Sequence, residues 1–596
     1  MSRPNSESPA IEGLLAAGFL ALTGAIVAAH RAPASGYEVS LYTATPWAVW
    51  LLLAGAMVIA LVISLESTVA RTRRLALCLG GGSILVFVGL PVLRGYWFIS
   101  GGDALTHLGW ARGIESGAFH PADLRYPGLH TVSTVFSAAV GIDLAQAMML
   151  VIVFLFGLFV LFVTLSTSLV LDRPYAATIG AFSAFLLLPI TNLSAYVAPH
   201  AMSQAILFSA VAMFLVLAYI RGDARSIGST PIGWLLGIAL VAIVLYHPQL
   251  AAHLLAVLGG VCAVQFCYRR YRPTHPVAAH RPMYAQTVVL AAAFVLWAAN
   301  HDFIRDVFTF HLVSTVDFFV GGGAPAGDSV DAQGDSLAEI GGSLFEIVLK
   351  LLGPHLALGG VTALCLAWLF IGNDSRLDRA TDGVLHYFAA GLVALTALFG
   401  VYFFGSSGEM YFRVFGFIML FVTIVGAVAT AYSMNALSRQ RPMPTRSIVA
   451  FGFVILLVAS SLALFPSPYV YSASPHVSEQ SMSGYDLALE SAADDVHFDG
   501  IRAGPNRYAD ARNAELDRTR VHSSIAGEEI EAGVAGQYEG ERYIGVDRQD
   551  WEREVLTYQE LRYTDEHFQS IPHQSGVNRV LSNGEVDAYY VHGETA

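Results

Sequence analysis

The chain has 596 residues, of which 55% are hydrophobic and only 13% carry a charge. Apolar runs of about 20 residues, the length that crosses roughly 30 Å of hydrocarbon, recur over the first 466 positions. This composition excludes a soluble globular fold and predicts an all-α polytopic membrane protein. The remaining segment, 467–596, has the composition of one small α+β domain.

The formal net charge of −13 lies almost entirely in the tail. The segment from Ser467 onward contains 24 acidic residues and 10 arginines, which gives a net charge of −14. Lys350 is the only lysine of the chain. An acid-rich, lysine-poor surface stays hydrated in high salt, where repulsion between like charges is screened over a few Å. The composition therefore favours a salt-loving archaeal source.

Thirteen apolar segments are expected to span the membrane. Arginines collect in every second loop, and the positive-inside bias then places the N-terminus in the cytoplasm and the tail outside. We divide the chain into N-terminal helices (1–73), a transmembrane core (74–466) with external loops at 94–143 and 301–353, and an acidic extracytoplasmic domain (467–596). The predicted spans are 11–30, 46–66, 74–93, 144–171, 175–190, 201–220, 231–247, 250–267, 284–300, 354–371, 383–404, 414–434 and 446–466.

Three smaller elements are expected outside the spans. Residues 128–142 are too few and too polar to cross the membrane, so they predict a helix at its surface. The 301–353 loop begins with apolar residues at helical spacing and continues as GGGAPAGDSVDAQGDS, a glycine-rich stretch suited to a lid. In the tail, GVNRVLSNGEVDAYYV predicts a β-hairpin across an Asn-Gly turn.

The densest polar sequence between two spans is the loop that starts at Arg94. Within it, Asp103 and His107 stand four residues apart behind Gly101-Gly102, so on a helix they share one face. A carboxylate beside a histidine at the end of a span is placed to act as a general base or to hold a divalent cation. The alternative is that Asp103 only caps the helix that starts there.

A second candidate site is SSGEMYFRVFGF, where Glu409 and Arg413 are also four residues apart. Arg413 begins a transmembrane run, where an ionisable residue is costly and by default a functional candidate. The planar guanidinium suits phosphate, so we expect Arg413, with Glu409, at a lipid phosphate. The alternative is an arginine whose side chain reaches out to the lipid headgroups.

Five further residues at the ends of spans or in the first loop are substrate-contact candidates. For each of them the alternative is an ordinary interfacial charge or a histidine satisfied in the core. No zinc-ligand spacing such as H-E-x-x-H occurs. The candidates are His200, His247, Arg112, Tyr126 and His130.

The run GGDALTHLGWARGIESG followed by YPGLH, with an arginine near a late external turn, resembles archaeal members of the GT-C superfamily of integral-membrane glycosyltransferases. The resemblance implies a GT-C-like membrane fold and transfer of a sugar from a polyprenyl or dolichyl phosphate to a glycan, lipid or protein acceptor. It assigns Asp103 as base or metal ligand, Arg413 as donor-phosphate contact, and a divalent cation, Mg²⁺ or Mn²⁺, as an optional cofactor. The Trp-Trp-Asp motif of oligosaccharyltransferases is absent, which favours transfer of a single sugar.

Two other functions stay open at this point. A transporter or flippase of lipid-linked sugars would also place charges beside a lipid path, but it predicts polar residues through the middle of the spans, where this chain has almost no charge. A non-catalytic envelope protein would use the acidic tail to bind surface partners. Substitution of Asp103 separates these interpretations, because a base is indispensable and a helix cap is not.

Overall fold

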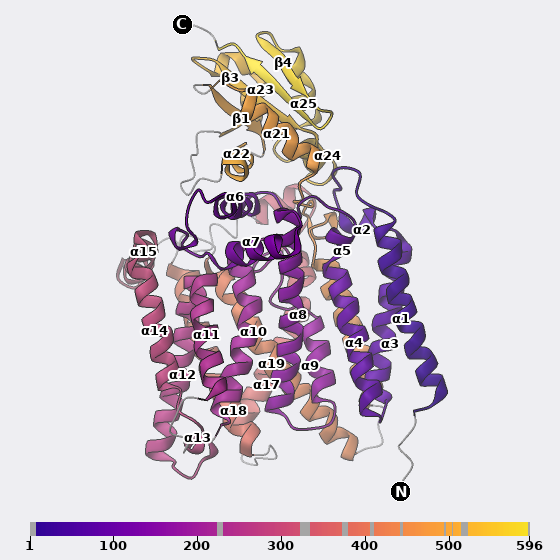
Figure 1. Ribbon diagram of the computed structural model, residues 1–596, viewed down its shortest axis with the longest axis vertical. Helices are drawn as coiled ribbons and strands as arrows, with labels where there is room; N and C mark the ends of the chain where they lie inside the picture. The colour runs from indigo at the N-terminus through magenta and orange to yellow at the C-terminus, as the bar shows by residue number, and fades with distance from the viewer. Residues whose placement is uncertain are drawn as a thin grey trace.

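The computed structural model describes residues 7–222, 230–321, 334–371, 379–405, 410–440, 445–493, 496–502, 505–513 and 523–593. A bundle of roughly parallel and antiparallel helices forms its lower part, and a small domain stands on one end of that bundle (Figure 1). The two termini lie at opposite ends of the molecule. The predicted all-α polytopic membrane protein with a small C-terminal α+β domain is confirmed.

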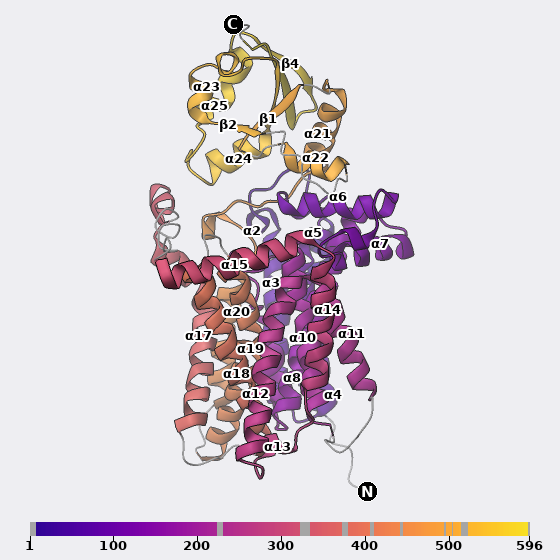
Figure 2. The ribbon, with the colours of Figure 1, turned by 90° about the vertical axis from the view of Figure 1, so that its left-hand side faces the viewer.

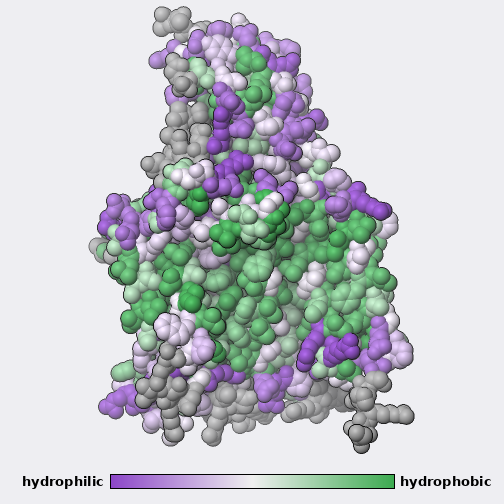
Figure 3. Space-filling model, in the orientation of Figure 1, coloured by the Kyte–Doolittle hydropathy of each residue, from purple (hydrophilic) through white to green (hydrophobic). Residues whose placement is uncertain are grey.

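All thirteen predicted spans coincide with helices of the bundle. Within the described residues, nine are long and apolar enough to cross a membrane, whereas α9, α11 and α14 are shorter and α4 begins with three arginines. On the face drawn in Figure 3, an apolar belt covers the bundle between two polar ends. The helices are α1 (Pro9–His30), α3 (Trp47–Glu66), α4 (Ala70–Val88), α8 (Leu144–Val170), α9 (Ala176–Phe185), α10 (Ala201–Ile220), α11 (Pro231–Tyr246), α12 (Pro248–Tyr271), α14 (Tyr284–Ala299), α17 (Leu344–Ile371), α18 (Arg379–Gly405), α19 (Met410–Gln440) and α20 (Thr445–Ala463).

Three helices lie across the end of the bundle beneath the C-terminal domain: α6 (Asp103–Ser116), α7 (Gly128–Val140) and α15 (Asp302–Gly321) (Figure 2). The predicted surface helix after Gly128 is therefore present. So is the helix at the start of the 301–353 loop. The stretch proposed as a lid falls mostly on residues 322–333, which lie outside the described residues. Short helices α2 (Leu41–Ala44), α5 (Leu90–Leu93) and α13 (Pro276–Ala279) join the longer ones.

Helix α9 ends earlier than the sequence predicts. The span was expected to reach residue 190, but the helix stops at Phe185, and the chain then runs irregularly to His200. Pro189 lacks the N–H that a helix needs, and Leu187 takes a positive φ of 52°. Irregular backbone at the level of a membrane is tolerated where it lines a cavity. This segment does so, since its residues form part of a cavity wall at the candidate site.

The C-terminal domain contains a five-stranded sheet in the order β2-β1-β3-β5-β4. Strands β1 and β3 pair in parallel, and β4 and β5 form the antiparallel hairpin that the Asn-Gly turn predicted. The strands are β1 (His497–Ile501), β2 (Ser523–Ile525), β3 (Arg542–Asp547), β4 (Val577–Ser582) and β5 (Val586–Val591), and the helices are α21 (Glu479–Ser491), α22 (Asn506–Asn513), α23 (Gly527–Glu531), α24 (Arg548–Leu556) and α25 (Asp565–Ser570).

Polar contacts fix this domain to the bundle. The Arg94 guanidinium donates to both carboxylate oxygens of Glu38, and the Glu38 backbone N–H donates to His476 in the segment leading to the domain. The Arg553 guanidinium of α24 donates to the Tyr37 hydroxyl at 3.1 Å. A backbone bridge pairs Phe98 with Val477. The domain is therefore held against the loops that surround the candidate site.

Candidate active site

Two hollows meet at the end of the bundle beneath the C-terminal domain. The first, the tail-side cavity, has a volume of about 650 Å³, and the second, the membrane-side chamber, about 620 Å³. Both are lined by the same four residues where they adjoin: Asp103, His200, Met410 and Arg413. These residues come from three parts of the chain that are far apart in the sequence. Asp103 belongs to the first loop, His200 precedes α10, and Met410 and Arg413 begin α19.

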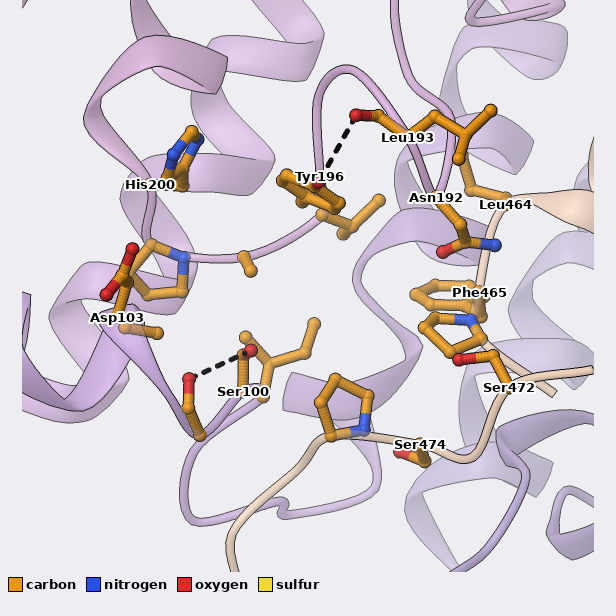
Figure 4. A pocket seen from close by; sticks show the side chains of 18 of the residues that line it. Ser100, Asp103, Asn192, Leu193, Tyr196, His200, Leu464, Phe465, Ser472 and Ser474 are labelled. Atoms are coloured by element: carbon orange, nitrogen blue, oxygen red, sulfur yellow. Dashed lines mark hydrogen bonds between the residues drawn. The ribbon is translucent and has the colours of Figure 1, made fainter. Parts of the chain in front are cut away.

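The tail-side cavity carries polar groups on two opposing walls (Figure 4). Asp103 and His200 lie on one side, and Asn192 and Ser472 lie across the hollow from them. The irregular segment after α9 forms part of the wall and is fixed by hydrogen bonds, such as the one from the Asn192 amide to the Ala463 carbonyl at 3.0 Å. A preformed cavity of this size with polar groups on both walls suits sugar units.

The membrane-side chamber is walled mainly by apolar side chains, which come from helices of the bundle and from α15. Phe294 comes from α14, Leu398 and Val401 come from α18, and Phe303 and Ile304 come from α15. Because α18 is a candidate membrane span, this chamber reaches the level of the hydrocarbon. It therefore offers an apolar surface that ends at the two charged residues of the junction.

Asp103 is the first residue of α6, and its side chain is 52% exposed. Gly102, at φ 58°, occupies the N-cap position, so the cap of this helix is not Asp103. A carboxylate oxygen of Asp103 lies 2.6 Å from Nη2 of Arg507, which belongs to α22 of the C-terminal domain. The carboxylate thus faces both hollows while a residue of the distant tail holds it.

Arg413 lies one turn inside α19, and its Nη1 donates to the Gln249 side-chain oxygen at 3.0 Å. Gln249 follows His247 and Pro248 at the start of α12, and all three line the membrane-side chamber. The guanidinium therefore puts a fixed positive charge at the inner end of an apolar chamber. That is the place where the phosphate of a lipid with its chain in the chamber would lie.

Histidines and aromatic rings form the wall beside Asp103. His107 Nδ1 lies 3.0 Å from His130 Nε2, and the Tyr126 ring stacks on His247 with centroids 5.1 Å apart. Burial lowers the pKa of His130 to about 3; burial, assisted by Arg413, lowers the pKa of His200 to about 4. The rings of His130 and His200 are thus neutral near pH 7 and can exchange hydrogen bonds without adding charge.

His247 presents a buried nitrogen, Nδ1, that has no hydrogen-bond partner within the described part of the chain. A buried ring nitrogen of this kind costs free energy until a partner arrives. Because His247 lines the chamber beside Gln249, a ligand at Arg413 lies against the same wall.

One predicted site residue is placed elsewhere, and another lies outside the described residues. Arg112 lines neither hollow; its Nη1 donates to the Ala511 carbonyl at 2.9 Å and so binds the C-terminal domain. Its prediction as a substrate contact is not supported by this position. Glu409 lies outside the described residues. The other candidates, Asp103, His107, Arg413, His200, His247 and Tyr126, all line the chamber, and His130 stands directly behind His107.

Asp103 has a guanidinium beside it and belongs to no group of three metal-ligating side chains among the described residues. Its surroundings therefore fit a cation poorly, and the mechanism proposed below uses none. The group that does occur, His275, Asp382 and His386, lies at the opposite end of the bundle, near α13 (Figure 2). There Val277 N–H donates to His275 Nδ1, and His275 Nε2 approaches Asp382 at 3.3 Å.

Several site residues escaped sequence reasoning. Gln249 and Tyr402 line the chamber, as does Trp110, one turn after His107. Gln249 stands beside His247-Pro248 at the start of a span, where a polar side chain is itself a signal. Arg507 carried no such signal, because it reaches Asp103 only through the folding of the tail onto α6.

No protein-family model matches the chain, and no curated protein matches its sequence. Solved structures with a similar chain path include ArnT from Cupriavidus metallidurans bound to undecaprenyl phosphate, at 10% identity and a TM-score of 0.45, covering 88% of this chain and 98% of that one. The apo oligosaccharyltransferase of Archaeoglobus fulgidus has 12% identity and a TM-score of 0.45, covering 85% and 74%. Because these TM-scores are below 0.5, the similarity carries no argument about function. The function proposed below therefore rests on the residues of the site.

Proposed function

We propose that this protein is a membrane glycosyltransferase of the GT-C type, which moves a sugar from a polyprenyl or dolichyl phosphate to an acceptor at the membrane surface. The observation that carries the proposal is the junction itself. A carboxylate, Asp103, and a guanidinium, Arg413, stand where the mainly apolar chamber meets the more polar tail-side cavity. A lipid-linked sugar has the same sequence of parts: an apolar chain, a phosphate and a polar sugar.

In this mechanism the acceptor hydroxyl loses its proton to Asp103 and attacks the anomeric carbon of the donor sugar. The bond between that carbon and the phosphate oxygen breaks, and the lipid phosphate leaves with one additional negative charge. Arg413 stabilises this charge, which develops during the reaction. The configuration at the anomeric carbon inverts. Positioning in the two hollows supplies the remaining acceleration.

We further propose that the N-terminus is cytoplasmic and that the site and the C-terminal domain face outside. The arginines that the sequence places in alternate loops support this orientation. We also propose that the chain divides into N-terminal helices (1–73), a transmembrane core (74–466) and an extracytoplasmic domain (467–596). A transporter would need a polar path through the bundle, whereas the two hollows of the site lie at the end of the bundle that carries the C-terminal domain.

The test is a transfer assay in membranes that contain the protein, with polyprenyl phosphate carrying a labelled hexose. Asp103→Asn should lower transfer about 100-fold or more, since a positioned general base contributes about that much. Arg413→Gln should also weaken donor binding. Asp123→Asn is the matched control, because this exposed carboxylate of the same loop lines neither hollow and accepts the His120 N–H of its own turn. Wild-type transfer by Asp103→Asn at equal expression would contradict the proposal.

A further inference from the structure

A third hollow lies between α3, α4 and α20 and is almost wholly apolar. We call it the α3–α20 groove; its volume is about 400 Å³. Its walls include Trp50, Leu53 and Leu61 of α3, Ile84 of α4 and Val458 of α20. Helices α3 and α20 are both candidate membrane spans, so the groove lies within the hydrocarbon.

The groove has the depth of one leaflet. Trp50 and Leu61 both line it, and eleven residues of α-helix rise about 16 Å. This is about half of the roughly 30 Å hydrocarbon core. Helix α3 starts at the end of the bundle that carries the C-terminal domain, so Trp50 marks the upper end of the groove (Figure 1). The groove therefore descends from the level of the candidate active site.

The side-chain polar atoms of Ser83, Trp50 and Tyr42 in the groove wall have partners within the protein. Ser83 Oγ donates to the Leu79 carbonyl at 2.9 Å, and Trp50 Nε1 donates to the Tyr42 carbonyl at 3.1 Å. The Tyr42 hydroxyl donates to the Ser461 carbonyl and accepts the Phe465 N–H at 3.1 Å. Burying a polar group here would cost free energy without a compensating hydrogen bond. The groove is therefore built for a hydrocarbon chain.

The upper end of the groove adjoins the tail-side cavity. Tyr42 lines the groove, and the preceding Leu41 lines the cavity. On α20 and beyond, Leu462 lines the groove, whereas Phe465 lines the cavity. The Tyr42 and Phe465 rings, 6.0 Å apart, form the wall between them. A lipid with its head in the tail-side cavity thus has a place for its chain directly below.

From this adjacency we infer that the α3–α20 groove holds the hydrocarbon chain of the acceptor, which makes the acceptor a lipid-linked glycan. The inference rests on the proposed function, in which the donor chain fills the membrane-side chamber. The groove and the chamber then approach the junction from different sides, each with its own chain. Head groups of donor and acceptor meet between Asp103 and Arg413.

Native mass spectrometry of the detergent-solubilised protein tests this inference, with undecaprenyl phosphate as the probe. Val458→Trp fills the groove, because this side chain lines it and is 55% exposed. Ile455→Trp is the matched control, since Ile455 is 52% exposed on the same helix but does not line the groove. We expect two bound probe molecules in the wild type and in Ile455→Trp, and one in Val458→Trp.

Two bound molecules in Val458→Trp would overturn the inference. Displacement of the groove-bound molecule by an equal concentration of dioleoyl phosphatidate would also overturn it, because the groove would then hold any membrane lipid. A different result would contradict the proposed function itself. If Arg413→Gln still bound two probe molecules, Arg413 would not hold the donor phosphate. Transfer assays complete the test: Val458→Trp should raise KM about tenfold for a polyprenyl-linked glycan and leave it unchanged for the same glycan freed from its lipid.

Discussion

The Asp103 carboxylate is held in place by Arg507 of the C-terminal domain. Arg507 contacts this carboxylate at 2.6 Å and also donates to the Thr106 hydroxyl at 2.9 Å. Thr106 in turn donates to Asp510 at 2.6 Å. These contacts fix the orientation of the carboxylate relative to both hollows. Arg507 therefore acts as a positioning residue, through Asp103.

Substitution Arg507→Gln should lower kcat of the transfer about 10- to 100-fold, because a small misplacement of a reacting group has an effect of that size. KM for the donor should change little, since the donor binds at Arg413. Arg507→Lys should restore part of the loss. Arg512→Gln is the control: Arg512 lies on the same helix but binds the Asp486 carbonyl. An equal loss in both variants would mean that α22 serves only the stability of the domain.

At the level of elements, α6 and α22 meet without space for a side chain between them. A Cβ at Gly109 would lie 2.0 Å from the backbone oxygen of Asp510. Gly109→Ala must therefore push α22 away from α6 and pull Arg507 from Asp103. We expect faster hydrogen exchange in α22 and a loss of transfer similar to that of Arg507→Gln. Gly81→Ala, which meets no atom within 4 Å, is the control.

If Gly109→Ala increased exchange in α22 while transfer stayed at the wild-type rate, the contact between the two helices would have no part in the reaction. The Arg507 effect would then need a cause other than the positioning of Asp103. Unchanged exchange together with unchanged transfer would show that α22 accommodates the methyl group by a local shift. The first result contradicts the proposal that the α6–α22 contact positions the base. The second contradicts the expectation that a methyl group at Gly109 displaces α22.

The elements also show how far sequence reasoning reached. Hydropathy located the helices because each span must bury an apolar length fixed by the membrane. It overestimated the length of α9, because the sequence up to residue 190 is apolar enough to span the membrane. In the structure the helix ends at Phe185, before Pro189 and the segment that lines the cavity. The Asp103 and Arg413 positions were predictable from the cost of charge at a span end. Arg507 was not, because Thr106 and Asp510 of the same contact are 404 residues apart.

For the whole molecule, three hollows with different chemistry meet near one end of the bundle. The most polar of them lies beneath the C-terminal domain, the mainly apolar chamber is lined by the last turns of α14 and α18, and the apolar groove follows α3 and α20. In the proposed function, this arrangement brings the water-soluble and hydrocarbon parts of the substrates to one carboxylate. A purely structural envelope protein has no need of such an arrangement.

The most direct test is a mass spectrum of surface glycans and lipid-linked oligosaccharides from a deletion strain complemented with the wild type, Asp103→Asn or Asp123→Asn. We expect glycans one sugar short and accumulated charged donor lipid in the deletion strain and with Asp103→Asn, and normal glycans with the other two. Full rescue by Asp103→Asn at equal expression, or normal glycans in the deletion strain itself, would contradict the assignment of Asp103 as the base of a glycosyltransferase.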